Sequence, residues 1–238
     1  MNKIILAALL AAMTTAVSAK TYTFQQDVDG YHGNMDVTLY SSEPDSSNGY
    51  EQELSIDASD SGSPNHVLVR FDELFGSAAN QIKAGETIVS ATLTLEITSA
   101  GSGILFHDML MDWDSASATW NSFDEGVQTD GVEAVATPFL VIGANNGDTN
   151  IQEGRLVLDF TEALRRMQAG SVPGYGWALL PFMPNGTNGV DFYSAEGFEL
   201  STRPLLTVEV SAVPEADSYA LMLAGLGLTA LMARRRRV

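Results

Sequence analysis

Residues 91–98 alternate apolar and polar side chains without interruption. In an extended chain the apolar side chains at positions 91, 93, 95 and 97 face one way and the polar ones the other. A period of two with β-branched residues is typical of a half-buried strand. Residues 66–71, 155–160 and 205–210 are further apolar or alternating runs, separated by clusters of Gly, Asn, Asp and Ser. This pattern predicts an all-β sandwich or barrel.

One short helix is expected after residue 159. Asp159 offers an acidic cap, and Glu162 follows three residues later as in a capping box. Leu164 and Met167 then share a helix face, and Gly170 supplies a stop. We expect this helix to cover one end of the sandwich.

The N-terminal segment has the pattern of a secretory signal peptide. Residues 1–19 contain Lys3, then an apolar run, then small residues up to Ala19. This pattern predicts an N-terminal signal helix that is removed between Ala19 and Lys20. The exported domain would then span residues 20–212, which is long enough for one sizeable β-domain without disulfides.

Charge and composition exclude several classes of partner and chemistry. Without its two end segments the chain keeps 7 basic and 28 acidic residues, a formal charge of about −21. Such a charge repels nucleic acid and anionic membranes, so we expect neither as a partner of the domain. The chain contains no cysteine, which excludes disulfides, thiol catalysis and cysteine-ligated metals.

No catalytic motif stands out in the sequence. The patterns G-x-S-x-G and H-E-x-x-H and a P-loop are all missing. The three histidines, His32, His66 and His107, are far apart along the chain and have no motif spacing. We therefore expect a protein that is not an enzyme and has no catalytic residues.

Two groups of residues are candidates for ligand binding. Asp27 and Asp29, followed by a glycine, resemble the opening of an oxygen-ligand loop and are candidates for a structural calcium ion. Aromatic faces can stack on sugar rings, and we expect a core role for Trp113 and Trp120 instead. The candidate carbohydrate-binding residues are Tyr31, Tyr50, Tyr175, Trp177 and Tyr193. We expect one of Tyr175 and Trp177 to face solvent.

Eight ordered segments between residues 20 and 212 resemble the DNRLRE domain family. These segments read NGYEQELSI, VLVRFD, IVSATLTL, WDSASATW, LVLDFTEALRRMQAG, GYGWALL, VDFYSAEG and RPLLTVEV. The resemblance implies a jelly-roll-like β-sandwich of the kind found in some carbohydrate-binding modules and in surface or matrix proteins.

Residues 213–238 resemble a PEP-CTERM sorting signal. Its features occur in order: a Pro-Glu pair, an uncharged run at 218–233 predicted to form a hydrophobic helix, and a terminal arginine cluster. The residues that carry the signal are Val213, Pro214, Glu215, Arg234, Arg235, Arg236 and Arg237. The resemblance implies export by the secretion machinery, a transient tether in the inner membrane, cleavage by an exosortase and release to the cell surface or the extracellular space. It also implies an association with exopolysaccharide and biofilm.

Together these features predict an exported, non-catalytic surface or matrix protein that binds polysaccharide. Two alternatives remain open. One is a polysaccharide-modifying enzyme, such as a lyase or a glycosidase, which would need an acid–base pair in a groove. The other is a purely structural matrix protein without a ligand.

Overall fold

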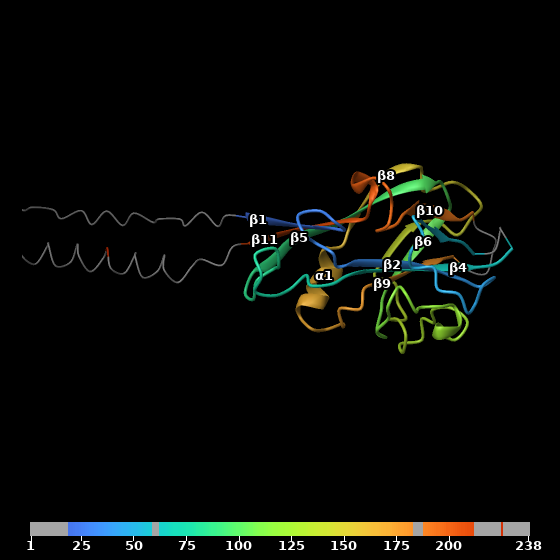
Figure 1. Ribbon diagram of the computed structural model, residues 1–238, viewed down its shortest axis with the longest axis horizontal. Helices are drawn as coiled ribbons and strands as arrows, with labels where there is room; N and C mark the ends of the chain where they lie inside the picture. Colours follow the sequence, from blue (N-terminus) through green and yellow to red (C-terminus); the bar gives the residue numbers. More distant parts are fainter. Residues whose placement is uncertain (1–18, 59–61, 183–187, 212–224, 226–238) are drawn as a thin grey trace, which may run out of the picture.

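Two antiparallel sheets account for the eleven strands that the structure describes (Figure 1). The structure is a computed structural model that describes residues 19–58, 62–182, 188–211 and 225. The first sheet contains β1 (Ala19–Gln25), β11 (Leu205–Ser211), β5 (Thr87–Ser99), β10 (Val190–Tyr193) and β3 (Glu53–Ile56) in that order, with β8 (Gly154–Asp159) also paired to β5. The second sheet contains β2 (Asn34–Tyr40), β4 (Asn65–Phe71), β9 (Trp177–Pro181), β6 (Gly103–Asp108) and β7 (Leu140–Gly143) in that order.

The alternating run at 91–98 forms the centre of the long strand β5, as predicted. Its apolar side chains are buried between the sheets, and its polar ones are partly exposed. The other three predicted runs form β4, β8 and β11. The predicted two-sheet β-sandwich is therefore confirmed, while its finer description as a jelly roll still rests on the resemblance.

An aromatic cluster fills the space between the two sheets. Phe160 packs edge-on against Trp177, with ring centroids 4.8 Å apart and planes at 90°. Phe106 also meets Phe160 edge-on, at 5.7 Å. Edge-to-face contacts of this kind add about 0.5–1.5 kcal/mol per pair to the stabilisation from burial. The cluster therefore ties β6, β9 and the end of β8 into one core.

A second apolar cluster covers the outer face of the second sheet. The segment between β6 and β7 folds across this face, beneath β2 and β9 in Figure 1, and includes the short 3-10 helix η1 (Asn121–Phe123). Trp113 and Trp120 of this segment pack in the cluster with Val37 and Leu68, which confirms their predicted core role. All five residues of β9 are buried because this strand has apolar neighbours on both of its faces.

The predicted helix is α1 (Thr161–Gln168), which packs against β5. Gly170 follows it with a φ of +68°, as expected for a helix stop. The predicted capping box is wrong, because the side chain of Glu162 binds Arg165 at 2.6 Å instead of returning to the cap. Asp159 still accepts the backbone N–H of Thr161 at 2.9 Å. A second 3-10 helix, η2 (Leu200–Thr202), precedes β11.

The predicted signal helix and C-terminal hydrophobic helix lie outside the described residues. Among the residues that are described, no helix is long and apolar enough to cross a membrane. Ala19 and Lys20, the predicted signal-cleavage pair, are the first two residues of β1. The proposed boundaries of the exported domain, residues 20–212, stay a prediction.

Candidate functional site

Arg70 of β4 is the centre of the most polar site on the second sheet. Its Nε lies 2.5 Å from Oδ1 of Asp72, and its Nη1 lies 2.5 Å from Oδ1 of Asp112. The same Nη1 donates to the backbone carbonyl of Trp113 at 3.0 Å. Burial alone would lower the pKa of Arg70, but the two carboxylates outweigh it and raise that pKa. The guanidinium thus stays charged and fastens β4 to the segment that follows β6.

A hollow of about 550 Å³ opens around this arginine. Its lining residues are Met35, Arg70, Asp72, Asp112, Trp113, Asp114 and Ser117. The ring of Tyr175 lies beside the hollow, with its centroid 5.6 Å from Cζ of Arg70 in a cation–π contact. The indole N–H of Trp113 donates to the carbonyl of Tyr175 at 2.7 Å, which fixes the backbone that carries the tyrosine.

The site combines oxygen acceptors with one aromatic face. Carboxylates accept hydrogen bonds from hydroxyl groups, and an aromatic face offers an apolar platform for C–H groups. Asp112 is well exposed, with 62 % of its side chain accessible, and can still accept hydrogen bonds from a ligand. Three carboxylates around one arginine disfavour an anionic ligand. The geometry suits a neutral, hydroxyl-rich molecule.

Two of the predicted carbohydrate-binding residues are core residues, so that part of the prediction is wrong. Tyr31 is only 5 % exposed, and its hydroxyl donates to the carbonyl of Asp72. Trp177 is fully buried. Of these two residues the one nearer the surface is the half-buried Tyr175, because Gly176, with a φ of +78°, interrupts the extended chain between it and Trp177. Sequence could not choose between them because both are large and amphipathic.

The remaining two candidates lie on separate elements. Tyr50 is 77 % exposed and follows Gly49, whose Cα faces the backbone of Ser115 next to the Arg70 hollow. Tyr193 is half-buried on β10, opposite Glu53 of β3. The structure thus brings Tyr175, and the loop that carries Tyr50, toward the second sheet's hollow, whereas Tyr193 lies on the first sheet.

The candidate calcium residues have protein partners of their own. Oδ1 of Asp27 lies 2.9 Å from Nδ1 of His32, and its Oδ2 lies 2.6 Å from Nη1 of Arg203. The hydrogen bonds from Arg203 and then His32 hold the pKa of Asp27 below its ordinary value. Asp27 and Asp29 both have positive φ, at 63° and 51°. Within the described ranges no three His, Asp or Glu side chains gather as a metal site, and calcium binding stays a prediction for melting experiments with added calcium.

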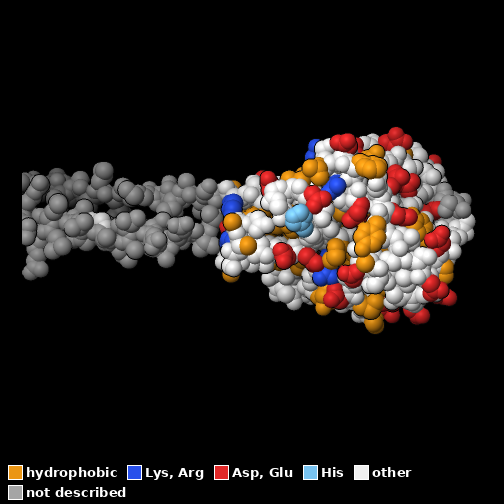
Figure 2. Space-filling model, in the orientation of Figure 1, with side chains coloured by type: hydrophobic (Ala, Val, Ile, Leu, Met, Phe, Trp, Pro, Cys, Tyr) orange, Lys and Arg blue, Asp and Glu red, His pale blue; other side chains and the backbone are white. Residues whose placement is uncertain are grey.

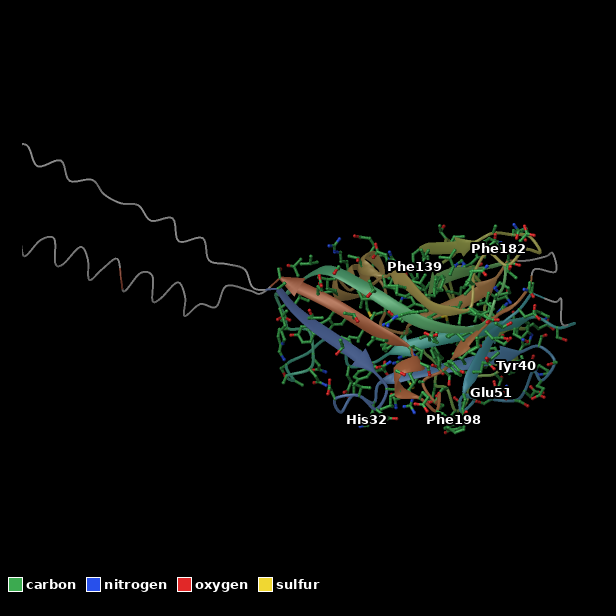
Figure 3. All side chains as sticks on the ribbon, turned by 90° about the horizontal axis from the view of Figure 1, so that it is seen from above. His32, Tyr40, Glu51, Phe139, Phe182 and Phe198 are labelled. Carbon is green, nitrogen blue, oxygen red and sulfur yellow. The ribbon has the colours of Figure 1, made fainter. Side chains whose placement is uncertain are left out.

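Another acidic hollow, of about 460 Å³, lies where β3 and β10 meet the end of β2. The hydroxyl of Tyr40 donates to Glu51 at 2.8 Å, and these two side chains lie together in Figure 3. Burial raises the pKa of Asp191, with smaller contributions from the charges of Glu53 and Asp57. An acid with a raised pKa near a second carboxylate is what the enzyme alternative would need, so this hollow is where degradation chemistry has to be tested.

Sequence reasoning missed two neighbouring acids, the buried Asp36 of β2 and the half-buried Glu196 of the loop after β10. Asp36 is 1 % exposed, and its Oδ2 accepts the backbone N–H of Ala195 at 2.8 Å. Burial raises its pKa well above the ordinary value, and the charge of Glu196 adds to that effect. Nothing in the local sequence marks the pair, because its two members are 160 residues apart.

Fold and site define the described part of the chain as an acidic β-sandwich protein with a polar surface hollow. In comparisons with known proteins, the family model of the PEP-CTERM protein-sorting motif matches residues 212–237. No curated protein matches the chain. The chain therefore carries a PEP-CTERM sorting motif, which marks it as an exported protein that an exosortase processes. The motif match includes all seven predicted sorting residues, from Val213 to Arg237, which lie outside the described residues.

The motif match leaves the sandwich itself unassigned. The family model matches residues 212–237 alone and no curated protein matches the chain, so the resemblance to the DNRLRE family stays a prediction. The function of the sandwich has to be argued from its own surface.

Proposed function

We propose that the protein is a non-catalytic component of the cell surface or extracellular matrix that binds a neutral polysaccharide in the Arg70 hollow. The observation that carries this proposal is the cluster of Arg70, Asp72 and Asp112 beside the half-buried ring of Tyr175. A sugar ring offers hydroxyl groups to the carboxylates and C–H groups to the aromatic face. Association with exopolysaccharide in a biofilm follows from this binding.

The surface charge favours a neutral ligand over an anionic one. Acidic side chains are spread over the face of the domain that Figure 2 shows. An anionic glycan would be repelled by this field, unless a divalent cation bridged the two. Within the hollow, Arg70 already has two carboxylate partners, so it offers an anionic sugar no unpaired cation.

A glycan array, run with and without calcium, tests the proposal. We expect the exported protein to bind neutral polysaccharides, and Tyr175→Ala to weaken binding at least about fivefold, since stacking on one aromatic ring is worth about 1–3 kcal/mol. Phe198→Ala is the matched control, because Phe198 is an exposed aromatic residue, at 83 %, on the loop after β10. Binding that survives Tyr175→Ala would contradict the assigned site.

A degradation assay on the same polysaccharides separates binding from catalysis. We expect no shortened products, because the proposed role is non-catalytic. Products that disappear in Asp191→Asn would instead establish the polysaccharide-modifying enzyme. No binding and no turnover would support the purely structural matrix protein.

A further inference from the structure

The sorting motif begins where the sandwich ends, with no linker between them. β11 ends at Ser211, and the motif match begins at residue 212. Ser211 is held on both sides, because it pairs with Ala19 of β1 and with Thr87 of β5. The chain therefore leaves the sheet from an interior strand that is anchored up to its last residue.

This anchoring places the cleavage region close to the folded domain. Pro214 and Glu215 follow Ser211 by three and four residues. At about 3.3 Å per residue, even a fully extended chain allows them to lie no farther than roughly 10–13 Å from the end of β11. An enzyme that holds several residues on each side of the cleaved bond cannot reach this segment without meeting the end of the sandwich.

The surface at this end, here called the exit face, is built around Lys20, Lys83 and Thr87. The ammonium of Lys20 donates to the hydroxyl of Tyr22 at 2.7 Å. That hydroxyl donates to Oε2 of Glu86 at 2.8 Å, and the same oxygen accepts the backbone N–H of Lys83 at 2.7 Å. The chain of hydrogen bonds fixes the loop before β5 against β1. The exit face is thus a preformed surface.

The two lysines of the exit face differ from most arginines of the domain in forming no ion pair with a described residue. Four of the five arginines of the domain, namely Arg70, Arg165, Arg166 and Arg203, form ion pairs with carboxylates. Neither Lys20 nor Lys83 forms an ion pair within the part of the chain that the structure describes. Figure 2 shows basic side chains at the end where β1 begins, whereas acidic ones are scattered over the rest of the visible face. A strongly acidic domain therefore presents, next to its sorting motif, two ammonium groups that form no ion pair among the described residues and donate to the Tyr22 hydroxyl and the Ala78 carbonyl instead.

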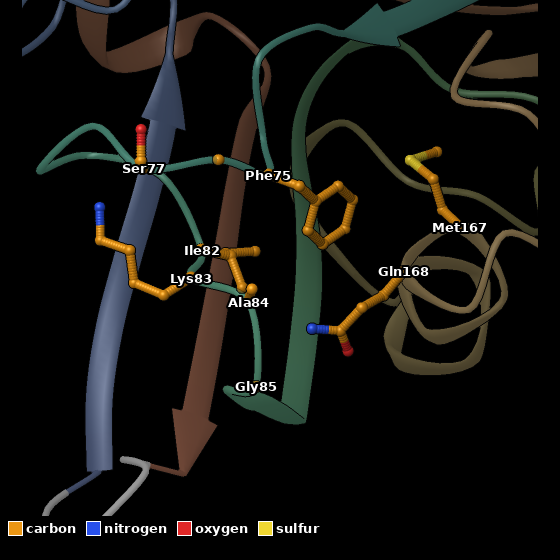
Figure 4. Close-up of a pocket in the computed structure, with 9 residues that line it drawn as sticks. Phe75, Ser77, Ile82, Lys83, Ala84, Gly85, Met167 and Gln168 are labelled. Carbon is orange, nitrogen blue, oxygen red and sulfur yellow. The ribbon is translucent and has the colours of Figure 1, made fainter. Parts of the chain in front are cut away.

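A hollow of about 730 Å³ opens beside the same loop. Figure 4 shows it between the loop that carries Phe75 and Ile82 and the helix residues Met167 and Gln168. Gly85, two residues before Thr87, also lines it. Its apolar lining gives a partner side chain a place to insert, and Lys83 at its border supplies charge.

We propose that the exit face is a contact surface for the exosortase, so that the folded domain takes part in recognition of its own sorting motif. The inference rests on the proposed processing by that enzyme. The occupant follows from connectivity. The resemblance to PEP-CTERM signals implies that the exosortase cuts near Pro214 and Glu215, and an enzyme that cuts there works within a few residues of Ser211. The two lysines without ion pairs and the apolar hollow are the features through which the domain contacts the enzyme.

The test compares processing of three full-length chains in cells that contain the exosortase. Lys83→Glu with Thr87→Glu reverses the charge of the exit face and leaves the signal-cleavage pair untouched. Arg155→Glu with Thr149→Glu makes the same charge change with exposed residues near the opposite end of β5, where Arg155 pairs with Glu96. We expect the exit-face variant to be processed at least fivefold more slowly than wild type, and the control variant to match wild type. Thermal melting checks that both variants are folded.

A spacer between the domain and the motif distinguishes direct contact with the enzyme from other effects of the substitutions. Inserting a flexible Gly/Ser segment of about ten residues between Ser211 and the motif should restore processing of the exit-face variant, because the enzyme no longer meets the domain. Equal processing of the variant and wild type without the spacer would overturn the inference. A defect that persists with the spacer would also overturn it, and would point to the lipid surface. If wild type itself is not cut, the proposed exosortase processing fails instead.

Discussion

The buried acids Asp36 and Glu196 predict an unusual dependence of stability on pH. Oδ1 of Asp36 and Oε2 of Glu196 are both buried without a hydrogen-bond donor among the described residues. Burial raises the pKa of both carboxyls, and the charge of Glu196 raises that of Asp36 further. Two neighbouring carboxyl groups in such surroundings cannot both be charged at low cost, so the pair keeps one proton between them. We therefore infer that the folded protein holds a proton that the unfolded chain releases.

The sign of the effect follows from proton linkage. An acid whose folded pKa is raised binds more protons in the folded state, so stability is complete below its unfolded pKa and is lost as pH rises toward the folded value. The loss is about 1.4 kcal/mol per pH unit while the folded protein keeps its proton. Asp36→Asn removes this loss, because an amide can accept the N–H of Ala195 and donate to Glu196 without titrating. From about pH 5 upward, the variant should gain about 1.4 kcal/mol per pH unit relative to wild type for as long as the folded wild type keeps its proton.

Urea denaturation of both proteins across this pH range measures the difference. Asp148→Asn, at an exposed loop position, is the matched control for the loss of one carboxylate. A difference between Asp36→Asn and wild type that stays constant between about pH 5 and pH 7 would refute the shared proton. A difference that grows with pH in the control as well would show that net charge alone is responsible.

Three further substitutions test the packing of the sandwich. Burial lowers the pKa of His66 to about 4, so stability should fall by about 1.4 kcal/mol per unit as pH drops from about 6.5 toward 4, and His66→Gln should flatten this slope in urea denaturation. Gly49→Ala would place Cβ 2.1 Å from the carbonyl oxygen of Ser115, so we expect a loss of about 1–3 kcal/mol. Gly147→Ala, with no atom within 4 Å, is its control and should change the free energy of unfolding by less than about 0.5 kcal/mol. Trp177→Ala should cost about 3–5 kcal/mol, and a calorimetric melting temperature close to that of wild type would contradict its place in the core.

Much of the sandwich could be predicted because strand periodicity is a local signal. The alternation at 91–98 fixes which side chains of β5 face the core, whatever the strand pairs with. The same reasoning failed at Tyr31, a residue near a turn that the sequence favours as exposed. Its ring packs instead between Phe24 and Phe71, at 5.3 and 6.5 Å. Burial of a turn residue depends on what folds over it, and local pattern contains no such information.

The capping box failed for a related reason. Spacing alone allows Glu162 to return to the cap, but Arg165 competes for its carboxylate at 2.6 Å. The Arg70 site could not be predicted from the sequence either, because Asp112 lies 42 residues from its arginine partner. Neither residue has a motif of its own. Only the pairing of β4 and β6 with β9 brings the two segments together.

The sequence by itself determined the class of the domain, the position of its main strands and the sorting motif at its end. These properties depend on residues that are neighbours along the chain, so periodicity, composition and short motifs record them. The tertiary structure decided which aromatic residues remain at the surface, which carboxylates surround Arg70 and which share a proton. It also decided that the motif starts directly beyond a strand held on both sides. These features depend on side chains brought together by strand pairing over long sequence distances, and no local pattern specifies them.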